Sequence, residues 1–137
     1  MIKKITNKDV MKLRIGDEIM LYGITDNAKV VTKKFFRVVN APSPIGVNNS
    51  IIVVLHKIKE DGTQIRDRWT GFTREVSIQW FKDREYFIDF SGARTRLYTD
   101  PKIPCEIVIK KLQDEKRNIN KKIMNCQRFM YQVKEEA

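Results

Sequence analysis

The stretch Ser50–Ile58, SIIVVLHKI, decides the fold. Its five consecutive apolar residues, 51–55, favour extended structure, and an apolar run of this length is typical of a strand buried on both faces. Asp61-Gly62 follows closely, and this dipeptide is a strong signal for a hairpin turn. The stretch therefore predicts a central strand in a mainly β fold.

Further short strands are expected on both sides of this stretch. Between residues 75 and 80, Val76, Ile78 and Trp80 alternate with polar residues, as in a half-buried strand. Strands at 10–15-residue spacing without intervening helices are typical of a sandwich or barrel, and we expect an SH3-like small barrel of five to six antiparallel strands. The expected strands are 18–22, 33–39, 50–58, 64–69, 75–80 and 86–90, with Pro/Gly-containing loops at 41–46 and 91–101.

Two helices are predicted at the ends of the chain. Thr6 followed by Asp9 has the spacing of a capping box and predicts a short N-terminal helix over 5–14. Pro101 and Pro104 mark the entrance of a helix that continues to about residue 135 without Gly or Pro. The predicted division is a barrel domain with its N-terminal helix at 1–100 and a long C-terminal helix at 101–137.

The C-terminal helix carries an apolar seam with alternating steps of three and four residues, the pattern of a coiled coil. At about 1.5 Å per residue the helix would be roughly 45 Å long, which exceeds a barrel of about 25 Å. The seam could pair two copies of the chain, dock on a partner protein, or pack in part on the barrel. Its members are Cys105, Ile109, Leu112, Lys116, Ile119, Ile123, Cys126, Met130 and Val133, and those from Ile109 to Met130 are the candidate dimerisation residues.

Charge is the strongest global signal. The chain has 27 Lys and Arg against 17 Asp and Glu, a formal net charge of +10. Such a field attracts polyanions, of which nucleic acid is the commonest, although the same excess can simply keep a protein soluble. Basic residues interleaved with aromatic ones identify the candidate nucleic-acid contacts, unless the aromatics are core and the charges their outward neighbours. These candidates are Lys33, Lys34, Arg37, Arg66, Arg68, Trp69, Arg74, Arg94 and Arg96.

Catalytic chemistry has little support in the sequence. His56 is the one histidine, and Cys105 and Cys126 lie about 30 Å apart on one straight helix, too far to bridge within a chain. No metal-ligand spacing, nucleophile motif or phosphate-binding loop is present, so we predict no enzyme, no metal and no cofactor. A nuclease with scattered acids such as Asp67 and Asp89 is the remaining enzymatic alternative.

The sequence also bears on location. The N-terminal residues contain no apolar region typical of a signal peptide. The apolar runs are all shorter than the ~18 residues that a membrane-spanning helix needs. Free thiols suit a reducing compartment. We therefore expect a cytoplasmic protein with no membrane association.

The stretch 11–22, MKLRIGDEIMLY, resembles the entry to SH3-like small barrels of the KOW and Tudor type, in which an apolar residue and Gly-Asp precede a strand. That resemblance implies a role alongside nucleic acid, RNA polymerase or ribosomes. The whole chain also resembles the small early proteins of large tailed phages that redirect host transcription or compact host DNA, which would place it in the host cytoplasm.

Two functional hypotheses follow. The first is a basic protein that binds DNA or RNA, with largely sequence-independent DNA binding that modulates transcription or host DNA, and with a homodimer formed through the C-terminal helix. The second is a protein-interaction module or inhibitor that docks on an acidic surface of a host machine, such as RNA polymerase or a defence enzyme.

Overall fold

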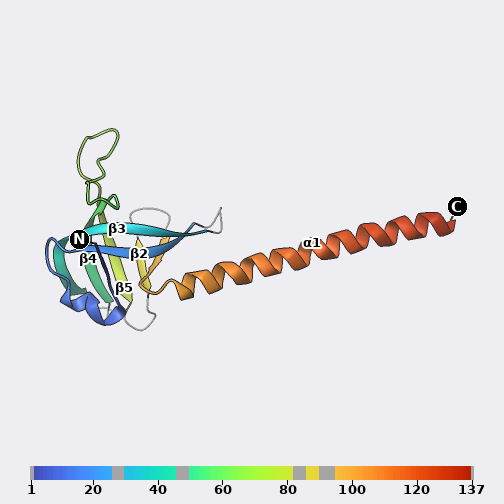
Figure 1. Cartoon of the computed structure of the whole chain (residues 1–137), viewed down its shortest axis with the longest axis horizontal. Helices are drawn as coiled ribbons and strands as arrows, with labels where there is room; N and C mark the ends of the chain where they lie inside the picture. Colours follow the sequence, from blue (N-terminus) through green and yellow to red (C-terminus); the bar gives the residue numbers. More distant parts are fainter. Residues whose placement is uncertain (1, 26–29, 46–49, 82–85, 90–94, 137) are drawn as a thin grey trace.

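The computed structural model describes residues 2–25, 30–45, 50–81, 86–89 and 95–136. Figure 1 shows a β-structure from which one long helix extends. The elements are β1 (Ile2–Lys4), a 3₁₀ helix (Asn7–Lys12), β2 (Glu18–Thr25), β3 (Val30–Ile45), β4 (Ser50–Ile58), β5 (Glu75–Phe81), β6 (Tyr86–Asp89), β7 (Thr95–Tyr98) and α1 (Lys102–Glu136).

The six strands β2 to β7 form a closed antiparallel barrel. Each strand pairs with the next in the chain, and β7 returns to β2 through Tyr22 opposite Tyr98 and Gly23 opposite Leu97. β1 is an extra strand that pairs parallel to the start of β2. The prediction of a mainly β fold, with a small antiparallel barrel and a long C-terminal helix, is confirmed.

Alternate residues of the strands fill the barrel. In β4, Ile51, Val53 and Leu55 are buried in the core, whereas Ile52 on the other face is partly exposed. The expectation that β4 is buried on both faces is therefore wrong, because a single closed sheet buries only its inner face here. Trp80 and Phe87 lie in the same core with ring centroids 6.2 Å apart, so the core assignment of Trp80 is confirmed.

Strand β3 is longer than expected. The loop predicted at 41–46 is wrong for residues 41–45, which continue the strand to Ile45; Gly46 lies outside the described residues. The pairing with β4 shifts register between Val38 and Asn40 and again between Asn40 and Ser43. Such irregularities allow a strand to include prolines, which cannot donate to a regular ladder.

Two other boundaries differ from the predictions. The segment 64–69 is not a strand; it takes part in two isolated bridges, Ile58 with Gln64 and Arg66 with Thr73. The predicted loop at 91–101 is wrong over Thr95–Tyr98, which form β7 and close the barrel. Residues 90–94, including the predicted end of the preceding strand, lie outside the described residues.

The N-terminal helix is shorter than the expected 5–14 and has 3₁₀ geometry. The Asp9 carboxylate accepts hydrogen bonds from the Thr6 amide at 2.9 Å and the Thr6 hydroxyl at 3.0 Å. Val10 is fully buried in the core, and Leu13 just after the helix is buried in the same core. This turn therefore covers part of the barrel core, and Thr6 and Asp9 hold its start.

Helix α1 is attached to the barrel by its first two turns. Asp100 accepts a hydrogen bond from the Lys102 amide at 2.9 Å, and Pro104 and Val108 are buried where α1 contacts β2 and β3. Of the described side chains beyond Val108, Glu115 is half-buried and the others are exposed. With 35 residues the helix is about 52 Å long, and most of it extends away from the barrel (Figure 1). None of the helices within the described residues is long and apolar enough to cross a membrane.

Replacing a core phenylalanine tests this packing. Phe36 is buried in the barrel core, so Phe36→Ala should lower the free energy of unfolding by about 3–5 kcal/mol, measured by urea denaturation followed by circular dichroism. Phe72→Ala is the matched control, because this exposed side chain should change stability by less than ~0.5 kcal/mol. Equal losses in the two variants would contradict the core assignment.

Candidate nucleic-acid interface

The chain leaves the barrel between β4 and β5, and we call residues 59–74 the β4–β5 projection. Figure 1 shows it standing clear of the barrel. It begins with the predicted turn at Asp61-Gly62, in which Gly62 adopts a φ of +88° and its amide donates to the Lys59 carbonyl at 2.9 Å. The Asp61 carboxylate accepts a hydrogen bond from the Thr63 amide at 2.8 Å. The first part of the projection is thus an ordered turn.

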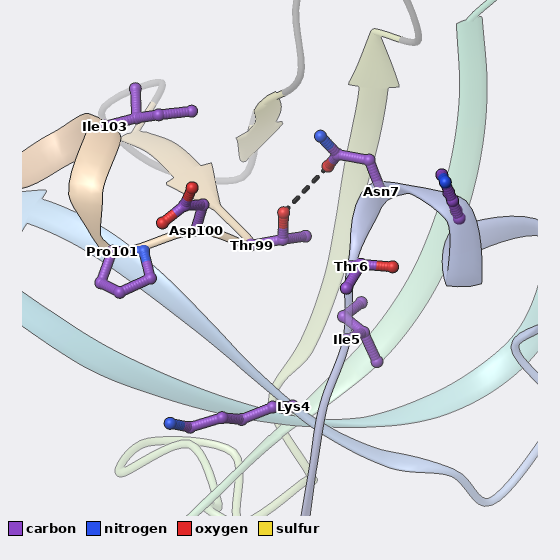
Figure 2. A pocket seen from close by; sticks show the side chains of 9 residues that line it. Lys4, Ile5, Thr6, Asn7, Thr99, Asp100, Pro101 and Ile103 are labelled. Carbon is purple, nitrogen blue, oxygen red and sulfur yellow. Dashed lines mark hydrogen bonds between the residues drawn. The ribbon is translucent and has the colours of Figure 1, made fainter.

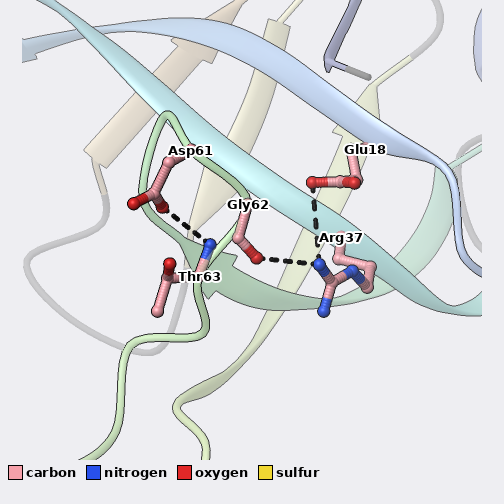
Figure 3. A network of polar contacts seen from close by, with 5 residues as sticks. All are labelled: Glu18, Arg37, Asp61, Gly62 and Thr63. Carbon is pink, nitrogen blue, oxygen red and sulfur yellow. Dashed lines mark hydrogen bonds and ion pairs between the residues drawn. The ribbon is translucent and has the colours of Figure 1, made fainter.

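Arg37 joins this turn to the barrel. Its guanidinium donates to the Gly62 carbonyl at 2.8 Å and lies 3.6 Å from the Glu18 carboxylate (Figure 3). Arg37 is also directly opposite His56, whose ring lies 3.7 Å from the Glu75 carboxylate. Arg37 was predicted as a phosphate contact. In the structure its guanidinium joins the turn at the foot of the projection to Glu18 on the barrel.

The outer part of the projection, residues 66–73, is a compact turn that we call the tip. The Asp67 amide donates to the Phe72 carbonyl at 2.7 Å, and the Gly71 amide donates to the Asp67 carbonyl at 3.0 Å. The Asp67 carboxylate accepts hydrogen bonds from the amides of Trp69 at 2.8 Å and Thr70 at 3.1 Å. Gly71 has a φ of +71°, a conformation that glycine adopts without strain. Backbone hydrogen bonds therefore hold the tip in one shape.

The tip presents two aromatic rings to solvent. Trp69 is 92% exposed and Phe72 is 76% exposed, and Arg66 and Arg68 beside them are exposed as well. Trp69 is therefore not part of the core. Large aromatic side chains are normally buried, and an ordered turn that exposes two of them is a candidate interaction site.

Arg74 lies at the foot of the projection. Its carbonyl accepts a hydrogen bond from the Lys57 amide at 3.0 Å. Burial lowers the pKa of the Lys57 ammonium, and the positive charges of Arg74 and Lys34 lower that pKa further, while Asp89 acts in the opposite direction. The inner foot of the projection thus carries a second group of basic residues.

The remaining predicted contacts lie on barrel strands that flank β2. Lys33 is exposed opposite Tyr22, and Lys34 is half-buried opposite Leu21. Arg96 on β7 is exposed, with its guanidinium 4.9 Å from the centre of the Tyr86 ring. Arg94 lies outside the described residues. The structure gathers Arg66, Arg68 and Trp69 on the tip, while Lys33, Lys34, Arg37, Arg74 and Arg96 are on the barrel or at the foot of the projection.

Sequence reasoning missed two residues of this region. Phe72 is absent from the predicted contacts, although Asp67 and Gly71 are local signals for a turn that includes Trp69 and ends at Phe72. Lys57 was read as part of a strand, and its position opposite Phe36 at the end of β4 is what brings it near Lys34 and Arg74. The first could have been found from turn chemistry, whereas the second depends on strand pairing.

A separate shallow groove of about 690 Å³ lies between the N-terminal segment and the junction of β7 with α1. Figure 2 shows the hydrogen bond that joins its two sides, from the Thr99 hydroxyl to Asn7 at 2.9 Å. Its titratable residues are Lys4, Lys8 and Asp100. Two lysines and one aspartate are few groups for acid–base catalysis. The exposed aromatic and basic side chains of the tip are the stronger evidence for a functional site.

The described part of the chain contains no group of three or more His, Cys, Asp or Glu side chains able to hold a metal ion. Comparison of the chain with protein-family models, curated proteins and solved structures finds no match. The functional argument therefore depends on the residues themselves.

The tip should lose its shape when Asp67 loses its charge. The amides of Trp69 and then Thr70 lower the pKa of the Asp67 carboxyl below its ordinary value of 3.8. Because the folded-state pKa is depressed, the stabilisation is present above the ordinary value and disappears as the pH falls through the lowered one. Asp67→Ala at neutral pH should therefore speed hydrogen exchange at the amides of Trp69 and Thr70, measured by NMR.

Asp61→Ala is the matched control, since Asp61 makes the same kind of bond to the Thr63 amide in the other turn of the projection. This variant should speed exchange at Thr63 and leave the tip amides unchanged. Unaltered exchange at Trp69 and Thr70 in Asp67→Ala would show that the carboxylate does not hold the tip.

Proposed function

We propose that this protein binds nucleic acid through the tip of the β4–β5 projection, largely without regard to base sequence. The observation that carries the proposal is the ordered turn that exposes Trp69 and Phe72 beside Arg66 and Arg68. Aromatic faces stack on any unpaired base, and arginine neutralises the adjoining phosphates. This combination suits single-stranded or locally opened DNA or RNA.

Long-range electrostatics supports the same proposal. The net charge of +10 attracts a polyanion before contact and raises the rate of encounter. Part of this charge is concentrated in α1, where Lys116, Arg117, Lys121, Lys122 and Arg128 follow one another without an intervening acid and are all exposed. The helix is thus a second surface along which phosphates could lie, while the tip supplies the contacts to bases.

We extend the proposal to the KOW/Tudor type of barrel and to a role in modulating transcription or host DNA inside a phage-infected cell. The support for this extension comes from one short segment of the chain. Gly16, with a φ of +93°, and Asp17, whose carboxylate accepts from the Arg14 amide at 2.9 Å, form the turn that leads into β2. This is the Gly-Asp entry on which the resemblance is based.

A second candidate function is docking on a protein. Tryptophan and arginine are the residues most enriched among the energetic centres of protein interfaces, and the tip presents Trp69 between Arg66, Arg68 and Phe72. An acidic surface with an apolar pocket on RNA polymerase or a defence enzyme would fit this chemistry. Nuclease-treated pull-downs with the intact chain and with Trp69→Ala separate this candidate from the first.

Nucleic-acid binding is tested by fluorescence anisotropy with labelled single-stranded DNA, single-stranded RNA and duplex DNA at low salt. Trp69→Ala should weaken binding to single strands by about 1–3 kcal/mol, roughly 5- to 150-fold, because one stacking platform is removed. Binding by the intact chain should also weaken steeply as salt rises, as expected when phosphates are neutralised.

Two controls isolate the tip. Trp69→Phe keeps an aromatic face and should retain most of the affinity, whereas Ile15→Ala removes an exposed apolar side chain elsewhere and should have no effect. If the intact chain binds none of the three nucleic acids at low salt, the proposal is wrong. If it binds and Trp69→Ala binds equally well, the tip is not the contact.

A further inference from the structure

The seam of α1 is uncovered along most of the helix. Its apolar members beyond Val108 are between about half and two thirds exposed, from 47% at Leu112 to 65% at Met130. Cys126 is exposed as well. The apolar seam residues are Ile109, Leu112, Ile119, Ile123, Cys126, Met130 and Val133.

The barrel is placed where it neither covers nor blocks this seam. Pro104 and Val108 attach α1 to the barrel, and at 100° per residue they face about a quarter turn away from the line between Ile109 and Leu112. Beyond them α1 continues for more than 25 residues as a single helix. Most of the stability of a helix in a protein comes from packing of its apolar face, and the barrel does not cover the seam of this part of α1. The exposed apolar seam of this extended helix therefore indicates that a partner packs along it.

We infer that the partner is a second copy of this chain, paired parallel and in register along residues 109–133. Burying one aliphatic side chain removes roughly 60–120 Å² from water, so the seven apolar seam side chains bury on the order of 400–850 Å² per copy. A stable interface buries about 800 Å² per partner. The upper end of this range reaches the size of a stable interface without help from the barrel.

Charges along the flanks are compatible with this pairing. In a parallel pair each side chain at a g position approaches the e position five residues later on the other helix. The e positions 113, 120 and 127 are the uncharged Gln113, Asn120 and Gln127, so neither Glu115 nor Lys122 meets a like charge there. A fully overlapping antiparallel pair would instead bring Lys122 beside its own copy.

Lys116 is the one polar layer of the seam. A single lysine at an a position lowers stability but selects one register, because any shift would bury it against apolar neighbours. In the parallel pair Lys116 lies opposite its own copy, and Glu115 of the second copy adjoins it and offers an opposite charge. Lys116 is thus compatible with the dimer and limits the two helices to one register.

The mass of the purified full-length chain, measured by light scattering without nucleic acid, tests this inference independently of the proposed function. The intact chain and Met124→Glu should have the mass of a dimer, and Ile123→Glu should have the mass of a monomer. Ile123 is 49% exposed on the seam and Met124 is 53% exposed beside it, off the seam, so both substitutions place a glutamate at an apolar position of similar exposure. A monomeric intact chain, or equal behaviour of the two variants, would overturn the inference.

Cys126 reports the alignment, because the parallel register places it directly opposite its own copy. In a Cys105→Ser background, oxidised glutathione should produce a chain linked to its copy through Cys126. A dimer that forms no such link would overturn the parallel register. Lys116→Ile should lower the dissociation constant of the dimer, measured by sedimentation, and a weaker dimer in this variant would contradict the role given to the polar layer.

Discussion

The pairing of β2 with β7 is the constraint on which the rest of the structure depends. Gly23 lies opposite Leu97 at this closure, and a Cβ atom at Gly23 would be only 3.2 Å from Leu97 Cδ2 and 3.3 Å from Lys34 Cε. The two strands therefore approach closely at a residue without a side chain. Closing the sheet removes its free edges, and it also places Tyr98, and hence the start of α1, beside Tyr22 on β2.

The closed barrel is the body from which two elements extend. The β4–β5 projection is attached by backbone hydrogen bonds of Lys57 with Arg74 and Ile65 and by Arg37, whose guanidinium contacts Glu18 and the Gly62 carbonyl. Helix α1 is attached through Pro104 and Val108. The barrel core is made of apolar side chains, whereas the exposed aromatic rings and much of the basic charge lie on the two extensions. In this account the projection contacts the ligand and the helix sets the assembly, so the barrel acts as the scaffold that holds both.

Local sequence patterns were sufficient to predict secondary structure where the residues of a segment determine its conformation. The alternation of Val76, Ile78 and Trp80, the Asp61-Gly62 turn and the long C-terminal helix are all present as predicted. The division of the chain at residue 100 and the assignment of individual nucleic-acid contacts remain predictions.

The remaining features depend on partners that are distant in sequence. Thr95–Tyr98 form a strand because they lie between β2 and β6, and no local signal reveals that closure. The strand expected at 64–69 had alternating polarity but no inner face to bury, so Asp67 and Gly71 turned the chain instead. At 41–45, pairing with β4 outweighed the prolines that suggested a loop.

For the candidate site, composition identified the arginines and Trp69 but could not separate a phosphate contact from a structural cation. Arg37 illustrates this limit, because its partner Gly62 is 25 residues away. Whether the tip contacts bases is the central claim. Photo-crosslinking of the full-length protein to single-stranded DNA carrying 5-iodouracil, followed by mass spectrometry, tests it most directly. The account predicts cross-links at Trp69 or Phe72; cross-links confined to α1, with the tip unmodified, would contradict it.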